Sequence, residues 1–147
     1  MSLRQKIEQD IKTAMLARNE VARDTLRMVL NGIKNREMET GRDSTDEDAL
    51  AVLATAAKTR QESIEQFDQA GRVDLATKER AELEVVRAYL PKQMGEAEVR
   101  KLVADLIAEL GLTSKKDIGA LMKAVMARHK GAVDGKLVQR IAGELLP

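Results

Sequence analysis

Apolar residues recur along this chain at spacings of three and four, and no segment alternates apolar and polar residues as a surface strand does. In the first segment, Leu3, Ile7 and Ile11 would lie on one side of a helix. Ser2 and Gln5 before and within it have the spacing of a capping box, in which each side chain pairs with the other residue's backbone N–H. The sequence therefore predicts an all-α fold.

Glycine, proline and short polar side chains divide the pattern into seven predicted helices. Helix ends are predicted near Gly41, Gly71, Pro91, Gly111 and Gly131. Helix starts are predicted after Ser2, Asn19, the polar connector 42–48, Asp74, Gly95, Ser114 and Asp134. The inward residues predicted for the last helix are Leu137, Val138, Ile141 and Leu145.

The stretch Pro91-Lys-Gln-Met-Gly95 is the break inside the chain that contains proline. The residue before a proline avoids helical angles, so a helix is expected to end there. We place a domain boundary at this point. Residues 1–93 are predicted to form an N-terminal helical bundle with a partly helical linker, and residues 94–147 a small three-helix domain.

Composition excludes several classes of protein. The chain has no cysteine, which removes disulfides, thiolate metal sites and thiol nucleophiles, and its one histidine, His129, cannot form a metal site alone. With one tyrosine and one phenylalanine it cannot stack RNA bases on an aromatic platform. No apolar run approaches a signal peptide or the roughly 20 residues of a membrane span, so we expect a soluble, cytoplasmic protein without a membrane partner.

No catalytic constellation is found, and neither a metal nor a cofactor is predicted. The carboxylates lie among lysines and arginines on helix faces, where surface ion pairing explains them. Gly131-x-x-x-Gly135-Lys136 superficially suggests a phosphate-binding loop, but that loop needs four residues between its glycines and Ser or Thr after the lysine. The glycines are better explained as helix ends, although a lysine near a helix start can still attract anions.

Basic residues gather in the last third of the chain, which makes this segment the best candidate for a surface that faces a polyanion. The candidate nucleic-acid-binding residues are Lys115, Lys116, Gly119, Lys123, Arg128, Lys130, Lys136 and Arg140. Lys116, Lys123 and Lys130 are seven residues apart and could form one phosphate-contacting stripe or simply a solvated helix face. Gly119 costs about 1 kcal/mol relative to alanine inside a helix, which favours either close helix packing or close approach of a ligand backbone.

Four motifs follow one another in a distinctive order. They are Leu26-Arg27-Met28 running into Ile33-Lys34, Ala88-Tyr89-Leu90-Pro91 with Gln93, Asp117-Ile118-Gly119 followed by Met122-Lys123, and Asp134-Gly135-Lys136 with Ile141 and a Leu-Leu end. In combination they resemble the GatB/YqeY family over essentially the whole chain. The resemblance implies two small helical bundles joined by a partly helical linker.

The resemblance also implies kinship with the C-terminal tail of the GatB component of the glutamine-dependent aminoacyl-tRNA amidotransferase, a tail that contacts the outer corner of tRNA. The similar part is about Glu96 to Pro147, and the matching positions are Gly119, Lys123, Asp134, Gly135 and Lys136. Carbon–nitrogen ligase activity with glutamine as amido donor belongs to that relative's complex, whose ATP site and amidase have no counterpart here.

The leading hypothesis is therefore a non-catalytic accessory protein that binds tRNA or another structured RNA through its last two helices. The alternative is a protein–protein interaction module that docks on an amidotransferase or another translation enzyme. The two are distinguished by whether co-purification with a partner survives nuclease and high salt.

Overall fold

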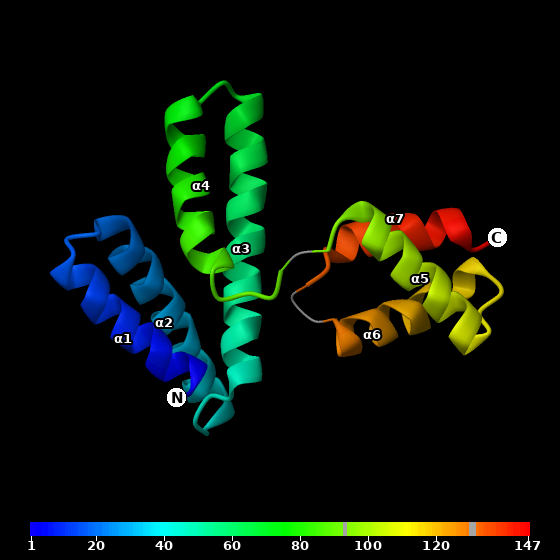
Figure 1. Cartoon of the computed structure of the whole chain (residues 1–147), viewed down its shortest axis with the longest axis horizontal. Helices are drawn as coiled ribbons and strands as arrows, with labels where there is room; N and C mark the ends of the chain where they lie inside the picture. The colour runs from blue at the N-terminus through cyan, green and yellow to red at the C-terminus, as the bar shows by residue number, and fades with distance from the viewer. Residues whose placement is uncertain (93, 130–131) are drawn as a thin grey trace. The chain divides into compact units, whose positions relative to one another are not determined.

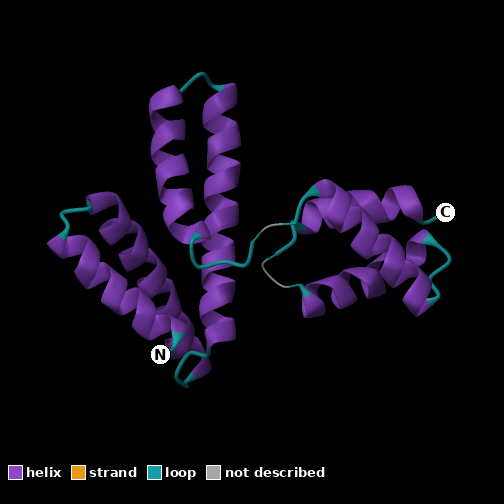
Figure 2. Cartoon of the chain, in the orientation of Figure 1, coloured by secondary structure: helices purple, strands orange, loops and turns teal. Residues whose placement is uncertain are grey.

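A computed structural model describes residues 1–92, 94–129 and 132–147. These residues form helices and loops without a strand, which confirms the predicted all-α fold (Figures 1 and 2). The helices are α1 (Leu3–Leu16), α2 (Glu20–Thr40), α3 (Asp46–Gln69), α4 (Val73–Arg87), α5 (Glu96–Leu110), the 3-10 helix η1 (Lys115–Asp117), α6 (Ile118–Arg128) and α7 (Gly135–Leu145). No helix of the described part is both long and apolar enough to cross a bilayer.

The chain divides into two compact units, Met1–Leu90 and Pro91–Pro147. The sequence places the boundary after residue 93, and Gln93 itself lies outside the described residues. Residues 88–92, which follow α4, are not helical, and the amides of Tyr89 and Leu90 donate to the carbonyls of Val86 and Arg87, each at 3.1 Å. The described part of the connection thus contains no linker helix.

The N-terminal unit consists of two helical hairpins, α1 with α2 and the longer α3 with α4 (Figure 1). Its core is aliphatic, as expected from a chain with two aromatic residues. The buried cluster comprises Ile7, Ile11, Leu26, Val29, Ile33, Ala49, Leu53 and Val86. Because these residues come from all four helices, the core joins the two hairpins.

The helix ends of the N-terminal unit follow the sequence closely. The Ser2 hydroxyl accepts from the Gln5 amide at 3.1 Å and the Gln5 side chain accepts from the Ser2 amide at 2.9 Å, which is the predicted capping box. Asn19 caps α2, and Gly41 ends that helix with a positive φ of 69°. Glycine adopts this left-handed conformation without the clash of a Cβ. These local interactions explain why the predicted boundaries are confirmed here.

The C-terminal unit packs α5, α6 and α7 around its own aliphatic core. The buried cluster comprises Val99, Val103, Leu106, Leu121, Val125, Val133, Val138, Ile141, Ala142 and Leu146. One prediction about this unit is wrong. Leu145 is 37% exposed and Leu146 is buried in its place, because the last helical residue is Leu145 and the chain then turns extended at Leu146.

The helix start predicted at Ser114, with Asp117 at the third position, is confirmed. Its first turn is the 3-10 helix η1, and α6 begins at Ile118. The Asp117 carboxylate accepts from the amides of both Thr113 and Ser114, at 3.0 and 3.3 Å, which tightens this turn. Gly131, the predicted end of the same helix, lies outside the described residues, and the described helix ends at Arg128.

Candidate nucleic-acid interface

Two short elements of the C-terminal unit carry the lysines that the sequence singles out. Lys115 and Lys116 lie on η1, and Lys123 lies on α6. The Lys115 amide donates to the Pro147 carbonyl at 3.2 Å, which ties this turn to the end of α7. Lys115 and Lys116 are therefore presented by a turn that is held by the Pro147 carbonyl and by the Asp117 carboxylate.

Lys115, Lys116 and Lys123 are exposed, and none of their ammonium groups forms an ion pair within the described part of the chain. Helix α6, from Ile118 to Arg128, contains no acidic residue at all. Lys116 precedes Lys123 by seven residues, from the 3-10 turn η1 into α6. The three lysines thus form a surface with uncompensated positive charge, called here the lysine face.

Gly119 lies between Lys116 and Lys123 and is exposed. A Cβ added to it would meet no described heavy atom within 4 Å. Of the two explanations that the sequence leaves open for Gly119, close helix packing has no support within the C-terminal unit. The space that a side chain would fill at Gly119 is open, which would let a ligand backbone approach the helix backbone there.

The candidate arginines differ from the lysines because each has a carboxylate partner. Arg128 forms a two-point pair with Glu109 through bonds of 3.0 and 2.9 Å, and its guanidinium lowers the pKa of that carboxyl. Arg140 donates to Glu96 at 2.8 Å. These partners belong to α5, whose acidic residues are Glu96, Glu98, Asp105 and Glu109. The arginines therefore neutralise α5 and are less available to phosphates than the lysine face.

The remaining candidates lie near the start of α7. The Asp134 carboxylate accepts from the Lys136 amide at 3.0 Å, so Asp134 is the predicted N-cap. Lys136 is exposed in the first turn of α7 but is engaged in interactions of its own. Lys130 lies outside the described residues, and the phosphate-contacting stripe predicted from the spacing of Lys116, Lys123 and Lys130 stays a prediction.

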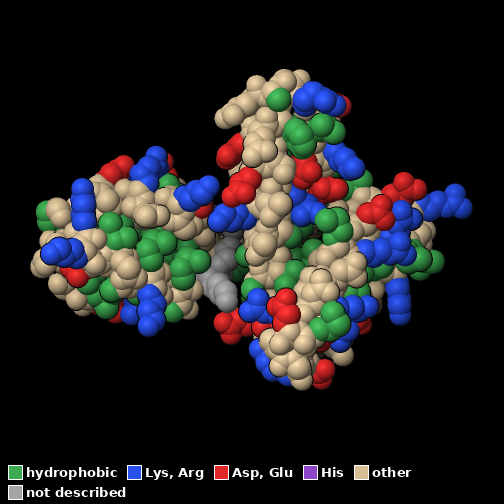
Figure 3. All heavy atoms as spheres, turned by 180° about the vertical axis from the view of Figure 1, so that it is seen from behind, with side chains coloured by type: hydrophobic (Ala, Val, Ile, Leu, Met, Phe, Trp, Pro, Cys, Tyr) green, Lys and Arg blue, Asp and Glu red, His purple; other side chains and the backbone are tan. Residues whose placement is uncertain are grey.

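Other chemistry is not evident in the described residues. No three acidic or histidine side chains among them lie close enough together to hold a metal ion. Basic and acidic side chains are interspersed over the face shown in Figure 3, in keeping with 25 basic and 24 acidic residues in the sequence.

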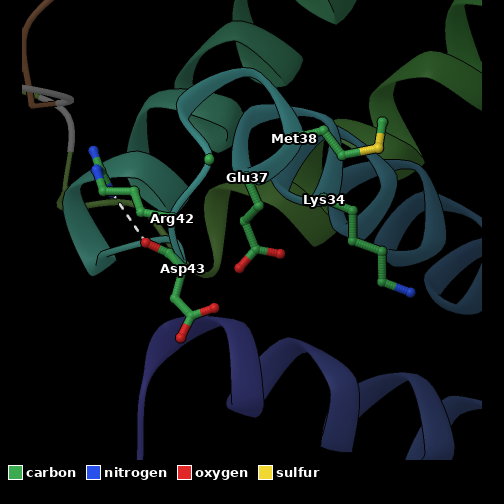
Figure 4. A pocket seen from close by; sticks show the side chains of 6 residues that line it. Lys34, Glu37, Met38, Arg42 and Asp43 are labelled. Atoms are coloured by element: carbon green, nitrogen blue, oxygen red, sulfur yellow. Dashed lines mark hydrogen bonds between the residues drawn. The ribbon is translucent and has the colours of Figure 1, made fainter.

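A hollow of about 360 Å³ lies at the end of α2 in the N-terminal unit (Figure 4). It is lined by Lys34, Glu37, Met38, Gly41, Arg42 and Asp43. Two of its charged side chains, Glu37 and Arg42, form hydrogen bonds that hold the connector between α2 and α3 in place. Glu37 accepts from the Ser44 amide at 2.9 Å, and Arg42 donates to Asp48 at 2.7 Å. We assign this hollow a structural role.

Comparison with known proteins decides the family. The family model described as YqeY-like protein matches residues 4–146. The chain belongs to the YqeY-like protein family. The membership predicted from the four motifs is thereby confirmed.

Curated relatives carry the name "Altered inheritance of mitochondria protein 41, mitochondrial". The protein from Lachancea thermotolerans is 36% identical over 107 residues, which cover 71% of this chain and 57% of the relative. That from Pyrenophora tritici-repentis is 31% identical over 144 residues, covering 96% of this chain and 79% of the relative. A third, from Vanderwaltozyma polyspora, is 31% identical over 120 residues, covering 76% of this chain and 64% of the relative. The chain thus spans between about half and four fifths of the length of these relatives.

These names correct one prediction. The cytoplasmic localisation expected from the sequence is contradicted, because the similar proteins are named mitochondrial. The sequence argument failed because it rested on the absence of a signal peptide and a membrane span, and neither absence specifies a compartment. The names state no activity for the relatives.

Proposed function

We propose that this chain binds structured RNA, with tRNA as the first candidate, through the lysine face of its C-terminal unit, and that it carries out no chemistry on the RNA itself. The observation that carries the proposal is the absence of acidic partners for Lys115, Lys116 and Lys123 within the described part of the chain, on an exposed surface. The resemblance of residues 96–147 to a tRNA-contacting tail supports the same surface. The same resemblance is the only basis for proposing kinship with a carbon–nitrogen ligase complex.

The physical basis is counterion release. A lysine that neutralises a phosphate displaces a condensed cation, so the affinity falls steeply as salt rises. Three unpaired lysines suit this mode of binding, which reads shape and charge and requires no aromatic side chains. Gly119 adds a place where the ribose–phosphate backbone could come close to the helix.

The test is a titration of the full chain with tRNA at several salt concentrations. A variant with Lys115, Lys116 and Lys123 all changed to Gln should bind more weakly, and the slope of log affinity against log salt should become shallower by about 2 to 3. A matched variant changes Lys12, Lys34 and Lys58, three exposed lysines of the N-terminal unit, to Gln. It removes the same charge and should bind tRNA like the unaltered chain.

Two results would count against the proposal. One is an unaltered chain that shows no tRNA binding even at low salt. The other is an equal loss of affinity in the two triple variants, which would indicate general attraction between charges instead of a defined face.

A further inference from the structure

Arg60 is a buried cation that lacks good hydrogen-bond acceptors. It lies on α3 and is 6% exposed. Its guanidinium has five N–H donors. Nη1 donates to the Ala56 carbonyl at 3.1 Å, whereas Nε is 3.4 Å from the Glu82 carboxylate and forms no hydrogen bond. A buried guanidinium usually has its donors satisfied, because leaving a buried charged group unsatisfied is costly.

The last acceptor of Arg60 is a methionine. Nη2 lies 3.7 Å from Sδ of Met28 on α2, and a thioether sulfur is a weak acceptor. Met28 is itself 59% exposed, so its side chain lies between the buried guanidinium and solvent. Because methionine is unbranched and flexible, it can move aside without disturbing the core.

A second contact between a guanidinium and a thioether is made by Arg27, which precedes Met28 and is exposed. Arg27 Nη2 lies 3.6 Å from Sδ of Met15 on α1, and Met15 is 50% exposed. Arg27 makes no ion pair within the described residues. In both contacts the Nη2 group has a methionine sulfur as its side-chain acceptor, and Arg60 is in addition ion-paired with Glu82 through Nε at 3.4 Å.

Apolar surface accompanies these cations. Val21 precedes Met28 by seven residues on α2 and is 42% exposed. Thr25, between them at helical spacing, is 1% exposed, and its hydroxyl is buried without a partner in the described part of the chain. Farther along the same side, Gly32 packs tightly on α3, since an added Cβ would lie 2.8 Å from Val52 Cγ1. Val21 and Met28 are thus exposed apolar residues on a side of α2 that also holds the buried Thr25 and the tightly packed Gly32.

We propose that the side of α2 marked by Val21 and Met28 is a docking site for an amphipathic helix of a partner protein, and that a carboxylate of this helix displaces Met28 Sδ as the acceptor of Arg60 Nη2. Charge complementarity selects the occupant, since a charge-assisted bond from a guanidinium to a carboxylate is about twice as strong as a neutral one. The exposed apolar side chains select a protein helix over a nucleic acid, because such helices bind through apolar residues at spacings of three, four and seven. This site lies in the N-terminal unit and is independent of the RNA proposal.

The probe is a peptide selected on the full chain. A phage-displayed library of helical peptides with randomised surface positions is selected against the protein, and the enriched sequences are synthesised and measured by calorimetry. We expect enriched peptides to carry Asp or Glu flanked by apolar residues at helical spacing. Met28→Glu should weaken their binding by about tenfold or more, because the new carboxylate occupies Arg60 from within the chain.

Two control variants test whether Met28→Glu weakens peptide binding because its carboxylate occupies Arg60. Met38→Glu places the same charge on α2 at a residue that is 77% exposed and ten positions away, and it should leave peptide affinity unchanged. Met28→Glu should raise the melting temperature and Met38→Glu should not, which shows that the first variant is folded and that Arg60 gained an acceptor. The Lys115, Lys116 and Lys123→Gln variant should bind the peptide normally, so failure of the RNA proposal leaves this one standing.

The proposal is overturned if the selection returns no binder, if the selected peptides lack an acidic residue, or if they bind Met28→Glu as tightly as the unaltered chain. Loss of tRNA binding in Met28→Glu but not in Met38→Glu would also overturn it, because the occupant of the site would then be a nucleic acid.

Discussion

The Tyr89 hydroxyl donates a hydrogen bond to the Asp10 carboxylate, joining the residues that follow α4 to α1. The Lys6 ammonium lies 5.4 Å from the centre of the same ring. The one tyrosine of the chain thus fixes the last turn of the N-terminal unit to its first helix, next to the connection with the C-terminal unit.

Tyr89→Phe should lower the free energy of unfolding of the N-terminal unit by about 1 to 2 kcal/mol, since a partly buried carboxylate loses its hydroxyl donor. Urea denaturation followed by circular dichroism measures this change. Lys6→Gln, which leaves the hydrogen bond intact, should have a smaller effect. Equal stability of the Tyr89→Phe variant and the unaltered chain would show that the bond contributes nothing.

The same contact predicts a dependence on alkaline pH. Burial of the phenol raises the pKa of Tyr89, and its hydrogen bond to Asp10 raises it further. Because the pKa of Tyr89 is higher in the folded than in the unfolded chain, the stability that this contact contributes is fully present below the unfolded pKa of about 10. This contribution is lost as the pH rises above that value. Ultraviolet titration should find a tyrosine that ionises above that value, and this loss of stability should be absent in Tyr89→Phe.

Asp48 predicts the behaviour of the protein in acid. It is 5% exposed, and its hydrogen bond with Arg42, together with bonds to Thr45 and Arg36, holds the pKa of the carboxyl well below its usual range. Because the pKa of Asp48 is lower in the folded than in the unfolded chain, the stability that the ionised carboxylate contributes is present above the unfolded pKa of about 4. This contribution is lost as the pH falls below that value. Asp48→Asn should be less stable at pH 7 and should lose less stability between pH 4 and pH 2, as measured by thermal melting across that range. A parallel decline in both proteins would contradict this origin.

Two glycines allow a matched comparison of packing and propensity. Gly32→Ala should destabilise the protein, because the new Cβ would lie 2.8 Å from Val52 Cγ1 and overpacking costs about 1 to 3 kcal/mol. Gly119→Ala meets no described atom within 4 Å and should gain up to about 1 kcal/mol from helix propensity. Denaturant midpoints of the two variants should therefore move in opposite directions.

Gly119→Ala also tests the role of the lysine face. If the RNA backbone approaches at Gly119, this variant should bind tRNA more weakly although it is more stable. A variant with unchanged tRNA affinity would show that Gly119 does not contact the RNA.

Thr25→Val should stabilise the N-terminal unit by about 1 kcal/mol. Its buried hydroxyl has no partner among the described residues, and valine has nearly the same shape without the cost of burying an unsatisfied polar group. Thermal melting tests this, with Thr55→Val as a control at an exposed position of α3. A destabilised Thr25→Val would indicate that the hydroxyl has an acceptor after all.

Sequence reasoning succeeds here where the determinants are local. Asn19, Gly41 and Asp134 act through bonds to residues within four positions of themselves, and all three mark helix ends as predicted. It succeeds less well where an end is set by longer connections. The first turn after Ser114 becomes a 3-10 helix whose Lys115 amide is bonded to the last residue of the chain.

At the candidate site, too, local features could be predicted from the sequence and contacts between distant residues could not. The sequence singles out Lys115, Lys116 and Lys123, and all three are exposed, with Lys115 and Lys116 on η1 and Lys123 on α6. It cannot show that Arg128 and Arg140 are paired with carboxylates of α5, which is more than 15 residues away in the sequence. Arg60 escapes sequence reasoning entirely, because its burial depends on Met28 of α2 and Glu82 of α4 and nothing near it in the sequence signals such partners.

α6 carries no acidic residue, and Lys115, Lys116 and Lys123 have no acidic partner in the described part of the chain, whereas Arg128 and Arg140 are paired with carboxylates of α5. The uncompensated positive charge of the C-terminal unit is therefore unevenly distributed and lies on the lysine face. Such a particle turns in the field of a polyanion before the two surfaces touch. A larger share of diffusional collisions then begins with α6 foremost, so the asymmetry raises the rate of productive encounter even where it adds little to the lifetime of the complex.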